Sequence, residues 1–245
     1  MKADPAVQRR LLDLAEVDAE LSRVRHRRTS MPELAEITAA ETAVRARRDA
    51  GVAVRTQLDD LDREAARQEK EIDAVRARED RDRKLLQGGT IGAKQLADLE
   101  HELHSLERRQ SVLEDDLLEL MERREAVELD VKHAEVELAK AEHVLAEATH
   151  RRDENLADLD TVDARRTAER AKILPGLPAD LLAFYERRVA QGRIGAALLR
   201  ARRCGACRLE LDSREISRIR ETAADDVVEC EECGAIMVRT AESGL

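Results

Sequence analysis

The sequence is poor in aromatic residues and contains no tryptophan. Phe184 and Tyr185 are the only two aromatic residues among 245. Because aromatic side chains supply much of the area that a globular core buries, this chain has little material for a thick core. Charged residues make up 39% of the chain, and alanine, leucine, glutamate and arginine are abundant. The composition argues against an ordinary globule and favours long helices that meet along narrow seams, or disorder.

Long apolar runs are also missing. No segment approaches the roughly 18 consecutive apolar residues of a membrane span, and the first residues show no basic stretch followed by an apolar one. We therefore expect a cytoplasmic protein without a membrane partner. The four cysteines should be reduced in that compartment, which favours metal binding over disulfides.

Positive charge is confined to one short region. The net charge is −10, yet residues 181–220 carry ten arginines against four acids, and residues 221–245 carry seven acids against one arginine. A protein that binds duplex nucleic acid usually has a basic footprint over its whole binding module. Here only the first half of the C-terminal region has one.

The middle of the chain has a regular apolar repeat, which favours ordered helices over disorder. Between residues 96 and 148 apolar residues recur at alternating intervals of three and four, interrupted only at Gln110 and Arg124. The series comprises Leu96, Leu99, Leu103, Leu106, Leu113, Leu117, Leu120, Val127, Val131, Ala134, Leu138, Ala141, Leu145 and Ala148. A 3.5-residue repeat keeps one stripe of a helix against a partner helix, so we predict a coiled coil. Residues 7–24 and 58–75 repeat the pattern less regularly.

A glycine-rich segment divides the helical region into two equal arms. Residues 87–93 contain three of the ten glycines, and glycine favours turns over helix interiors. We predict an antiparallel two-helix hairpin over residues 1–173 with its tip at about 87–93. Two parallel homodimeric coils are the alternative, but they would leave the equal arms unexplained. We expect a kink at about 29–32, where Ser30-Met-Pro-Glu33 resembles a capping box with proline near the start of a helix.

The C-terminal region contains the residues that suggest chemistry. The run Leu174-Pro-Gly-Leu-Pro178 should end the hairpin, so residues 174–245 form a second domain with a linker, a short helix and a small metal-binding fold. Within it lie two CxxC pairs separated by 22 residues, and together they contain all four cysteines of the chain: Cys204, Cys207, Cys230 and Cys233. This spacing predicts a four-thiolate site for one Zn²⁺. Because cysteine fills every position, the metal should be structural, and it should supply stability that so small a core lacks.

Two segments resemble a known family. Residues 99–124, just after the predicted tip, and residues 184–239, from Phe184-Tyr-Glu-Arg-Arg188 through both cysteine pairs to Ile236-Met-Val-Arg239, are similar to bacterial coiled-coil proteins with a C-terminal C4-type zinc ribbon. The arginine- and alanine-rich usage resembles an actinobacterial member. The resemblance implies a helical hairpin followed by a zinc ribbon, with residues 193–202 as a strand, although their alanine and leucine content favours helix. It also implies adaptor or chaperone roles in assembly machinery, or binding of RNA or a transcription factor.

The leading functional hypothesis is a non-enzymatic zinc-binding adaptor that binds protein partners through the elongated coiled coil. No phosphate-binding loop, serine nucleophile motif or cysteine–histidine nucleophile pair is present, and we expect no small-molecule substrate. The alternative is a regulatory protein that binds RNA or DNA through the basic side of the ribbon. Its candidate contacts are Arg187, Arg188, Arg200, Arg202, Arg203 and Arg208.

Two smaller features have competing interpretations. Phe184 and Tyr185 could stack on bases, but we expect them to pack the ribbon against the coil. The acidic stretch 114–116, with Glu119 and Glu122, could bind a basic partner, but a solvated helix face is the expectation.

Overall fold

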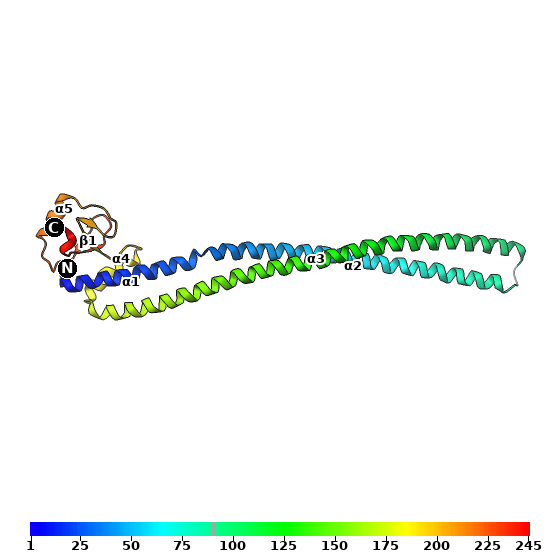
Figure 1. The fold of residues 1–245 in the computed structure, drawn as a ribbon, viewed down its shortest axis with the longest axis horizontal. Coiled ribbons are helices and arrows are strands. Elements are labelled where there is room, and N and C mark those ends of the chain that lie inside the picture. Colours follow the sequence, from blue (N-terminus) through cyan, green and yellow to red (C-terminus); the bar gives the residue numbers. More distant parts are fainter. Residues whose placement is uncertain (90–91) are drawn as a thin grey trace. The chain divides into compact units, whose positions relative to one another are not determined.

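A computed structural model of the chain describes residues 1–89 and 92–245. Its elements are α1 (Pro5–Thr29), α2 (Pro32–Gln87), α3 (Ala93–Ile173), η1 (Leu174–Gly176), α4 (Ala179–Ala190), β1 (Ala196–Arg200), β2 (Arg203–Cys204), α5 (Ser213–Glu221), β3 (Val228–Glu229), β4 (Ile236–Val238) and η2 (Ala241–Ser243). The chain is mainly α, with a small sheet near its C-terminus (Figure 1). Residues 90 and 91 of the predicted tip lie outside the described residues.

The elements form two compact units. One comprises Met1–Leu34 and Arg151–Leu245, and the other comprises Ala35–His150. The end of α3 at Ile173 coincides with the boundary that we predict between the hairpin and the C-terminal domain. The packing units divide the chain elsewhere, because the first helix and the last turns of α3 pack with the C-terminal region. The division at 173/174 therefore stays a prediction.

Within residues 35–150, α2 and α3 form an antiparallel hairpin (Figure 1). Ion pairs between the two helices show the direction, because partner numbers fall along α3 as they rise along α2. The pairs are Arg48 with Glu142 at 3.2 Å, Arg55 with Glu135, Arg76 with Glu114 at 2.6 Å, and Arg83 with Glu107 at 3.3 Å. The predicted fold class, an antiparallel two-helix coiled coil followed by a small C-terminal ribbon, is confirmed.

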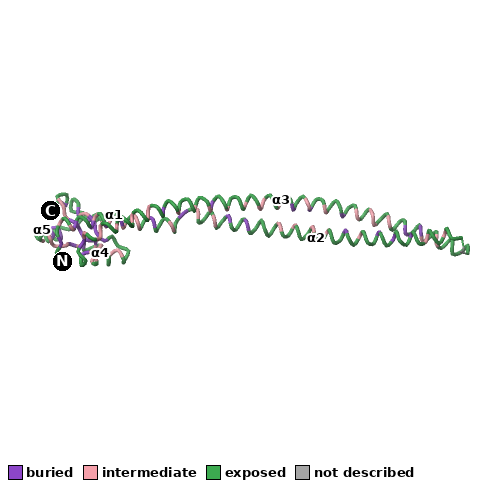
Figure 2. Tube along the Cα trace, turned by 90° about the horizontal axis from the view of Figure 1, so that it is seen from below, coloured by how far each residue is buried: buried purple, intermediate pink, exposed green. Residues whose placement is uncertain are grey.

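The hairpin seam uses the predicted repeat. Buried residues recur along both helices of this unit (Figure 2). They are Ala40, Val44, Ala65, Ile72 and Val75 on α2, and Leu103, Leu106, Leu120, Val127, Val131 and Ala148 on α3. Leu96, the first residue of the predicted series, is the exception because its side chain is 39% exposed. Among the described residues, no helix is long and apolar enough to cross a membrane.

Gly51 is a weak point inside α2, and its replacement should stabilise the hairpin. A Cβ at this position would lie 4.0 Å from the Cβ of Ala134, an ordinary contact distance. Because glycine costs about 1 kcal/mol relative to alanine inside a helix, Gly51→Ala should raise the free energy of unfolding by about that amount. Urea denaturation followed by circular dichroism measures the change. No gain, or a loss, would show that the backbone at Gly51 departs from a regular helix.

The break between α1 and α2 falls at residues 30 and 31, but the predicted capping box does not form. Ser30 caps the end of α1, where its hydroxyl donates to the carbonyl of His26 at 2.9 Å. Glu33 accepts from the side-chain amide of Asn155 at 2.8 Å instead of turning back to the cap. The prediction of Pro32 near a helix start is correct, because α2 begins at that residue. Ser30 could cap either the end of α1 or the start of α2. Its hydroxyl bonds a carbonyl at the end of α1, which has no partner within the helix.

In the unit that contains the ribbon, the first residues of the chain form backbone hydrogen bonds with the segment before β3. The backbone N–H of Ala3 donates to the carbonyl of Asp225 at 2.7 Å, and that of Val227 donates to the carbonyl of Met1 at 2.9 Å. The side chain of Gln8, only 2% exposed, donates to the carbonyl of Ala3 at 2.8 Å. The first helix is therefore joined to the ribbon by a short backbone ladder.

The sheet has the order β2-β1-β4-β3 and positions the cysteine segments. Strand β1 pairs antiparallel with β2 and parallel with β4, and β3 pairs antiparallel with β4. The strand implied by the family resemblance is confirmed over Ala196–Arg200. The helix preference of its alanines and leucines is overridden because β1 is central and hydrogen-bonds on both edges.

Candidate metal centre

The first cysteine pair lies in a tight turn that follows β2. The backbone N–H of Arg208 donates to the carbonyl of Cys204 at 2.8 Å, and that of Cys204 donates to the carbonyl of Leu209 at 3.0 Å. A Cβ at Gly205 would lie 2.6 Å from the carbonyl oxygen of Leu198, so glycine is required there. Arg208 has φ of 64°, in the left-handed region that favours glycine.

The second pair repeats this turn. The backbone N–H of Gly234 donates to the carbonyl of Cys230 at 2.9 Å, and that of Cys230 donates to the carbonyl of Ala235 at 3.0 Å. Gly234 has φ of 73°, close to the 64° of Arg208. The two cysteine turns therefore share one geometry, although the sequence places arginine in the first where the second has glycine.

The two turns bring the four thiols together. The Sγ atoms of Cys204 and Cys233 are 3.8 Å apart, those of Cys207 and Cys230 are 3.9 Å apart, and all four lie within 4.8 Å of one another. A tetrahedral zinc with Zn–S bonds of about 2.3 Å places its sulfurs about 3.8 Å apart. In the described part of the chain this is the one cluster of potential ligands suited to a metal. The four cysteines fit a single Zn²⁺ and complete its coordination.

The site is built into the core of the ribbon. Cys204 and Cys230 are buried, and they pack with the apolar side chains of α5 and the sheet. These side chains belong to Leu199, Leu211, Ile216, Ile219, Val228 and Met237. A structural metal in this position joins segments that have few other apolar contacts.

The thiol pKa values predict proton release on zinc binding. Burial raises the pKa of the Cys204 and Cys230 thiols, whereas the backbone N–H of Leu209 lowers that of Cys207. Zinc binds thiolates, and cysteine thiols without metal are mostly protonated near neutral pH, so zinc must displace protons and its affinity should rise with pH. Titration calorimetry in buffers of different ionisation enthalpy should show about two or more protons released per zinc at pH 7. Release of fewer than one would contradict coordination of the zinc by four thiolates.

Arg188 is a structural residue, although we predicted it as a candidate nucleic-acid contact. Its guanidinium lies 3.6 Å from the ring centre of Phe184, donates to the carbonyl of Gly234 at 2.5 Å, and forms an ion pair with Glu229. The side chain is only 13% exposed. It connects α4 to the second cysteine turn and has little surface to offer a ligand. Arg187 is exposed on the same helix.

Three of the other predicted arginines lie at the surface around the β1–β2 turn, and Arg208 is exposed in the first cysteine turn. Arg200 pairs with Glu242 at 3.1 Å and Arg203 pairs with Glu210 at 2.7 Å. Arg202 donates to a backbone carbonyl at 3.0 Å. All three side chains are exposed, so their partners hold them without burying them.

Arg239 has a structural role that we did not predict from the sequence. Its guanidinium donates to four backbone carbonyls, those of Ile219, Thr222, Ala223 and Asp226, at 2.6–3.2 Å. These carbonyls lie at the end of α5 and in the segment after it, where a cation is favoured. No local pattern marks this arginine, because its partners lie 13–20 residues away in the sequence.

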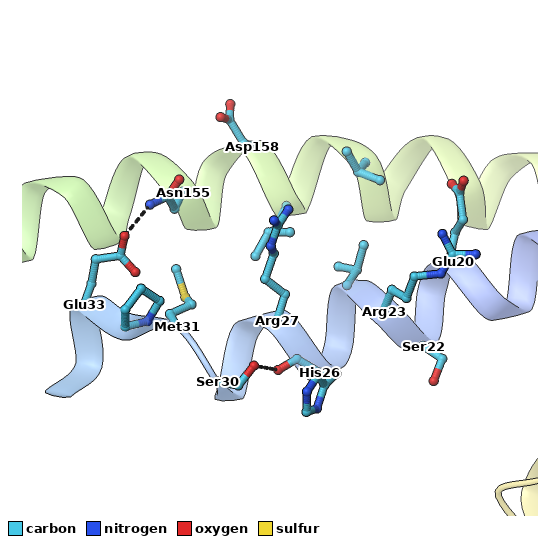
Figure 3. Close-up of a pocket in the computed structure, with 14 residues that line it drawn as sticks. Glu20, Ser22, Arg23, His26, Arg27, Ser30, Met31, Glu33, Asn155 and Asp158 are labelled. Atoms are coloured by element: carbon cyan, nitrogen blue, oxygen red, sulfur yellow. Dashed lines mark hydrogen bonds between the residues drawn. The ribbon is translucent and has the colours of Figure 1, made fainter.

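The helix break next to Ser30 leaves an open groove of 1010 Å³ (Figure 3). It is lined by the end of α1, the start of α2 and residues 155–162 of α3. Met31, only 5% exposed, fills part of the space that the missing helical turn leaves, and Glu33 and Asn155 bridge its edge. None of the predicted site residues lines the groove.

A second candidate surface lies on α3 within the hairpin unit. Several large apolar side chains there are exposed, and three of them lie along one line of the helix: Leu118 is 64% exposed, Leu129 65% and Val136 52%. Val112, Met121 and Val144 are also exposed but lie off that line. Leu118 and Leu129 each lie two residues from a buried seam residue, and two residues turn about 200° around a helix. We call Leu118, Leu129 and Val136 the outer row. We did not predict the outer row from the sequence.

The fold and the cysteine cluster define a helical hairpin protein with a four-cysteine zinc ribbon. Family models for the CT398-like coiled coil hairpin domain and the C4-type zinc ribbon domain match residues 14–193 and 203–237. The chain belongs to the family of CT398-like coiled coil hairpin proteins with a C4-type zinc ribbon. The predicted resemblance is thereby confirmed.

Relatives from mycobacteria are similar over nearly the whole chain. The uncharacterized protein Rv2229c of Mycobacterium tuberculosis is 45% identical and covers 98% of both chains. A solved structure from Mycobacterium smegmatis has 42% identity and a TM-score of 0.88, covering 98% of this chain and all of its own. The structure of CT398 from Chlamydia trachomatis has a TM-score of 0.67 at 16% identity, covering 95% of this chain and 97% of its own, which shows a shared fold.

Proposed function

We propose that this protein is a cytoplasmic, non-enzymatic adaptor whose protein partner docks on the hairpin of α2 and α3, while the zinc ribbon has a structural role. One observation carries the proposal. The outer row of Leu118, Leu129 and Val136 is exposed on α3, and the hairpin's own seam does not use it.

The spacing of the outer row distinguishes it from scattered surface residues. Single exposed apolar side chains are common and need no explanation. Here the intervals are 11 and 7 residues, about three and two helical turns, so the three side chains lie along one line of about 27 Å. A line of this kind is what a helical partner contacts in coiled-coil and helix-groove recognition.

The metal site supports a structural role for the ribbon. Four cysteines complete the coordination of one zinc and leave no position for water or a substrate. In this proposal the metal holds the ribbon together and takes no part in chemistry.

Capture from native cell extract tests the adaptor role. The tagged protein should retain a specific protein partner after nuclease treatment, and a variant with Leu118, Leu129 and Val136 all changed to Gln should lose it. The matched control changes Val52 and Leu85 to Gln, because these are exposed apolar residues on α2 outside the outer row, and it should retain the partner. Equal capture by both variants, or no specific protein partner with the wild type, would refute the proposal.

Binding of RNA or DNA by the ribbon is the second candidate function. The observation in its favour is that Arg200, Arg202 and Arg203 are exposed around one turn. It predicts a gel shift that weakens steeply with salt and is reduced by the double change Arg202→Ala and Arg203→Ala. Our leading proposal predicts no shift at physiological salt.

A further inference from the structure

Charge is distributed unevenly between the two helices of the hairpin. Residues 93–150 of α3 contain sixteen acids and seven lysines or arginines, whereas residues 35–87 of α2 contain thirteen and twelve. Nearly all of the net charge of −10 therefore belongs to α3. Such an excess on one helix gives that helix a negative field which its partner helix does not neutralise.

The acids of α3 fall into two groups. Those beside the seam form ion pairs with arginines of α2, as Glu114, Glu135 and Glu142 do. A second group is exposed and, within the described residues, has no ion pair or hydrogen bond. They are Asp115, Asp116, Glu119, Glu122 and Glu125. Asp116 and Glu119 lie about 160° and 100° around the helix from Leu118, so we call only Asp115, Glu122 and Glu125 the outer acids.

The outer acids and the outer row share one face of the helix. Glu122 and Glu125 follow Leu118 by four and seven residues, so they lie on the same line between Leu118 and Leu129. Asp115 precedes Leu118 by three residues and lies on that line as well. Between Asp115 and Leu129 the face therefore presents apolar side chains interleaved with carboxylates that form no ion pair with any described residue, and Lys132, paired with Glu128 at 3.0 Å, follows Leu129.

We propose that this outer face of α3 binds a basic amphipathic helix of a partner protein, a proposal that rests on the adaptor function above. Apolar side chains of the partner would pack on Leu118, Leu129 and Val136, and its lysines and arginines would pair with the outer acids. The interleaving matches the way coiled coils combine an apolar stripe with flanking charges that set partner choice.

The charge pattern argues against the two other occupants of such a face. A second copy of the chain in parallel register would place its own outer acids beside these, and like charges in contact oppose association. A nucleic acid would bring phosphates against carboxylates, which is repulsive. A basic helix is the occupant whose charge complements the face.

Designed peptides provide a direct probe. The first is a helical peptide of about three heptads with leucines on one face and lysines beside them. The second has glutamate in place of every lysine, and the third has the composition of the first in scrambled order. Fluorescence anisotropy with the full-length zinc-loaded protein should show binding of the first peptide, at least about tenfold weaker binding of the third, and none of the second. Binding of the first should weaken as salt increases, because exposed charges are screened.

Charge reversal on the protein locates the site. Glu122→Lys with Glu125→Lys should weaken the basic peptide by at least about tenfold and should allow the acidic peptide to bind. The matched control, Glu69→Lys with Glu71→Lys, makes the same change in net charge at two exposed acids of α2 and should leave both peptides within about threefold of wild type.

Each result has a defined consequence. Equal binding of the basic and acidic peptides, or equal effects of the two double variants, would overturn the basic-helix proposal. Failure of every peptide to bind, with native capture still dependent on the outer row, would overturn it and leave the adaptor function standing. Sedimentation equilibrium showing a dimer that Leu129→Gln dissociates would assign the face to a second copy and overturn it as well.

Discussion

Replacing both Cys204 and Cys230 with serine is expected to unfold the ribbon and leave the hairpin of residues 35–150 intact. The two thiolates come from different turns, and both are buried in the core that the metal joins. Binding of a structural zinc contributes about 10–16 kcal/mol in small metal-dependent folds, which exceeds the stability that so few apolar contacts can supply. Removing half of the ligands should therefore abolish the ordered ribbon.

Two signals separate the ribbon from the hairpin. Methyl resonances of Ile216, Ile219 and Ile236, which are all buried in the C-terminal region, should collapse to random-coil positions. The helical circular dichroism signal of the long helices should fall only slightly. A strong chelator added to the wild-type protein should give the same two results.

Arg208→Gly is the matched control in the same turn. It keeps every ligand and relieves a left-handed backbone with φ of 64°. It should leave zinc binding unchanged and raise the free energy of unfolding by up to about 1 kcal/mol. Retention of the ordered isoleucine signals by the double serine variant would show that the ribbon does not need its metal.

Gly195→Ala is expected to destabilise the unit that contains the ribbon by about 3 kcal/mol or more, because it overpacks a fully buried contact. A Cβ at Gly195 would overlap the ring of Tyr185, which has no exposed surface. The ring cannot move aside freely. Its hydroxyl donates to Asp18 at 2.9 Å, and Asp18 is held in turn by Arg170 at 2.8 Å.

Denaturation followed by tyrosine fluorescence measures this loss, since Tyr185 is the only tyrosine and the chain has no tryptophan. Isoleucine methyl signals follow the companion variants that lack the tyrosine. The overlap predicts coupling between the two positions. Gly195→Ala should cost at least about 1 kcal/mol less in a Tyr185→Leu background than in the wild type, because leucine has no ring to overlap. An equal cost in both backgrounds would show that the alanine acts through the backbone and not through the ring.

The sequence was sufficient for the hairpin and the metal ligands because both depend on regular spacing. A repeat of three and four residues identifies seam positions such as Leu120 and Val127 without reference to the rest of the fold. Two CxxC pairs likewise bring four thiols together whatever the intervening chain does. The packing of Tyr185, which we predicted in preference to base stacking, followed from the scarcity of other aromatic residues.

The predictions that were wrong concern residues with more than one available partner. Ser30 could cap either of two helix ends, and composition alone does not reveal which carbonyls remain unpaired. Arg188 belongs to a basic cluster in the sequence, but it is buried against Phe184 and Glu229 in the fold. The outer row was visible in the spacing of Leu118, Leu129 and Val136, but a search for one apolar stripe passes over a second one.

Site-specific photo-crosslinking in the native cell tests most directly whether a protein partner docks on the outer face of α3. A photoreactive amino acid at position 129 lies on the proposed docking face, whereas the same amino acid at position 66 lies on the exposed face of α2. We expect a specific protein crosslink from position 129, lost when Glu122 and Glu125 are changed to Lys, and no matching crosslink from position 66. The same crosslink from both positions, or a crosslink only from position 66, would contradict docking on this face.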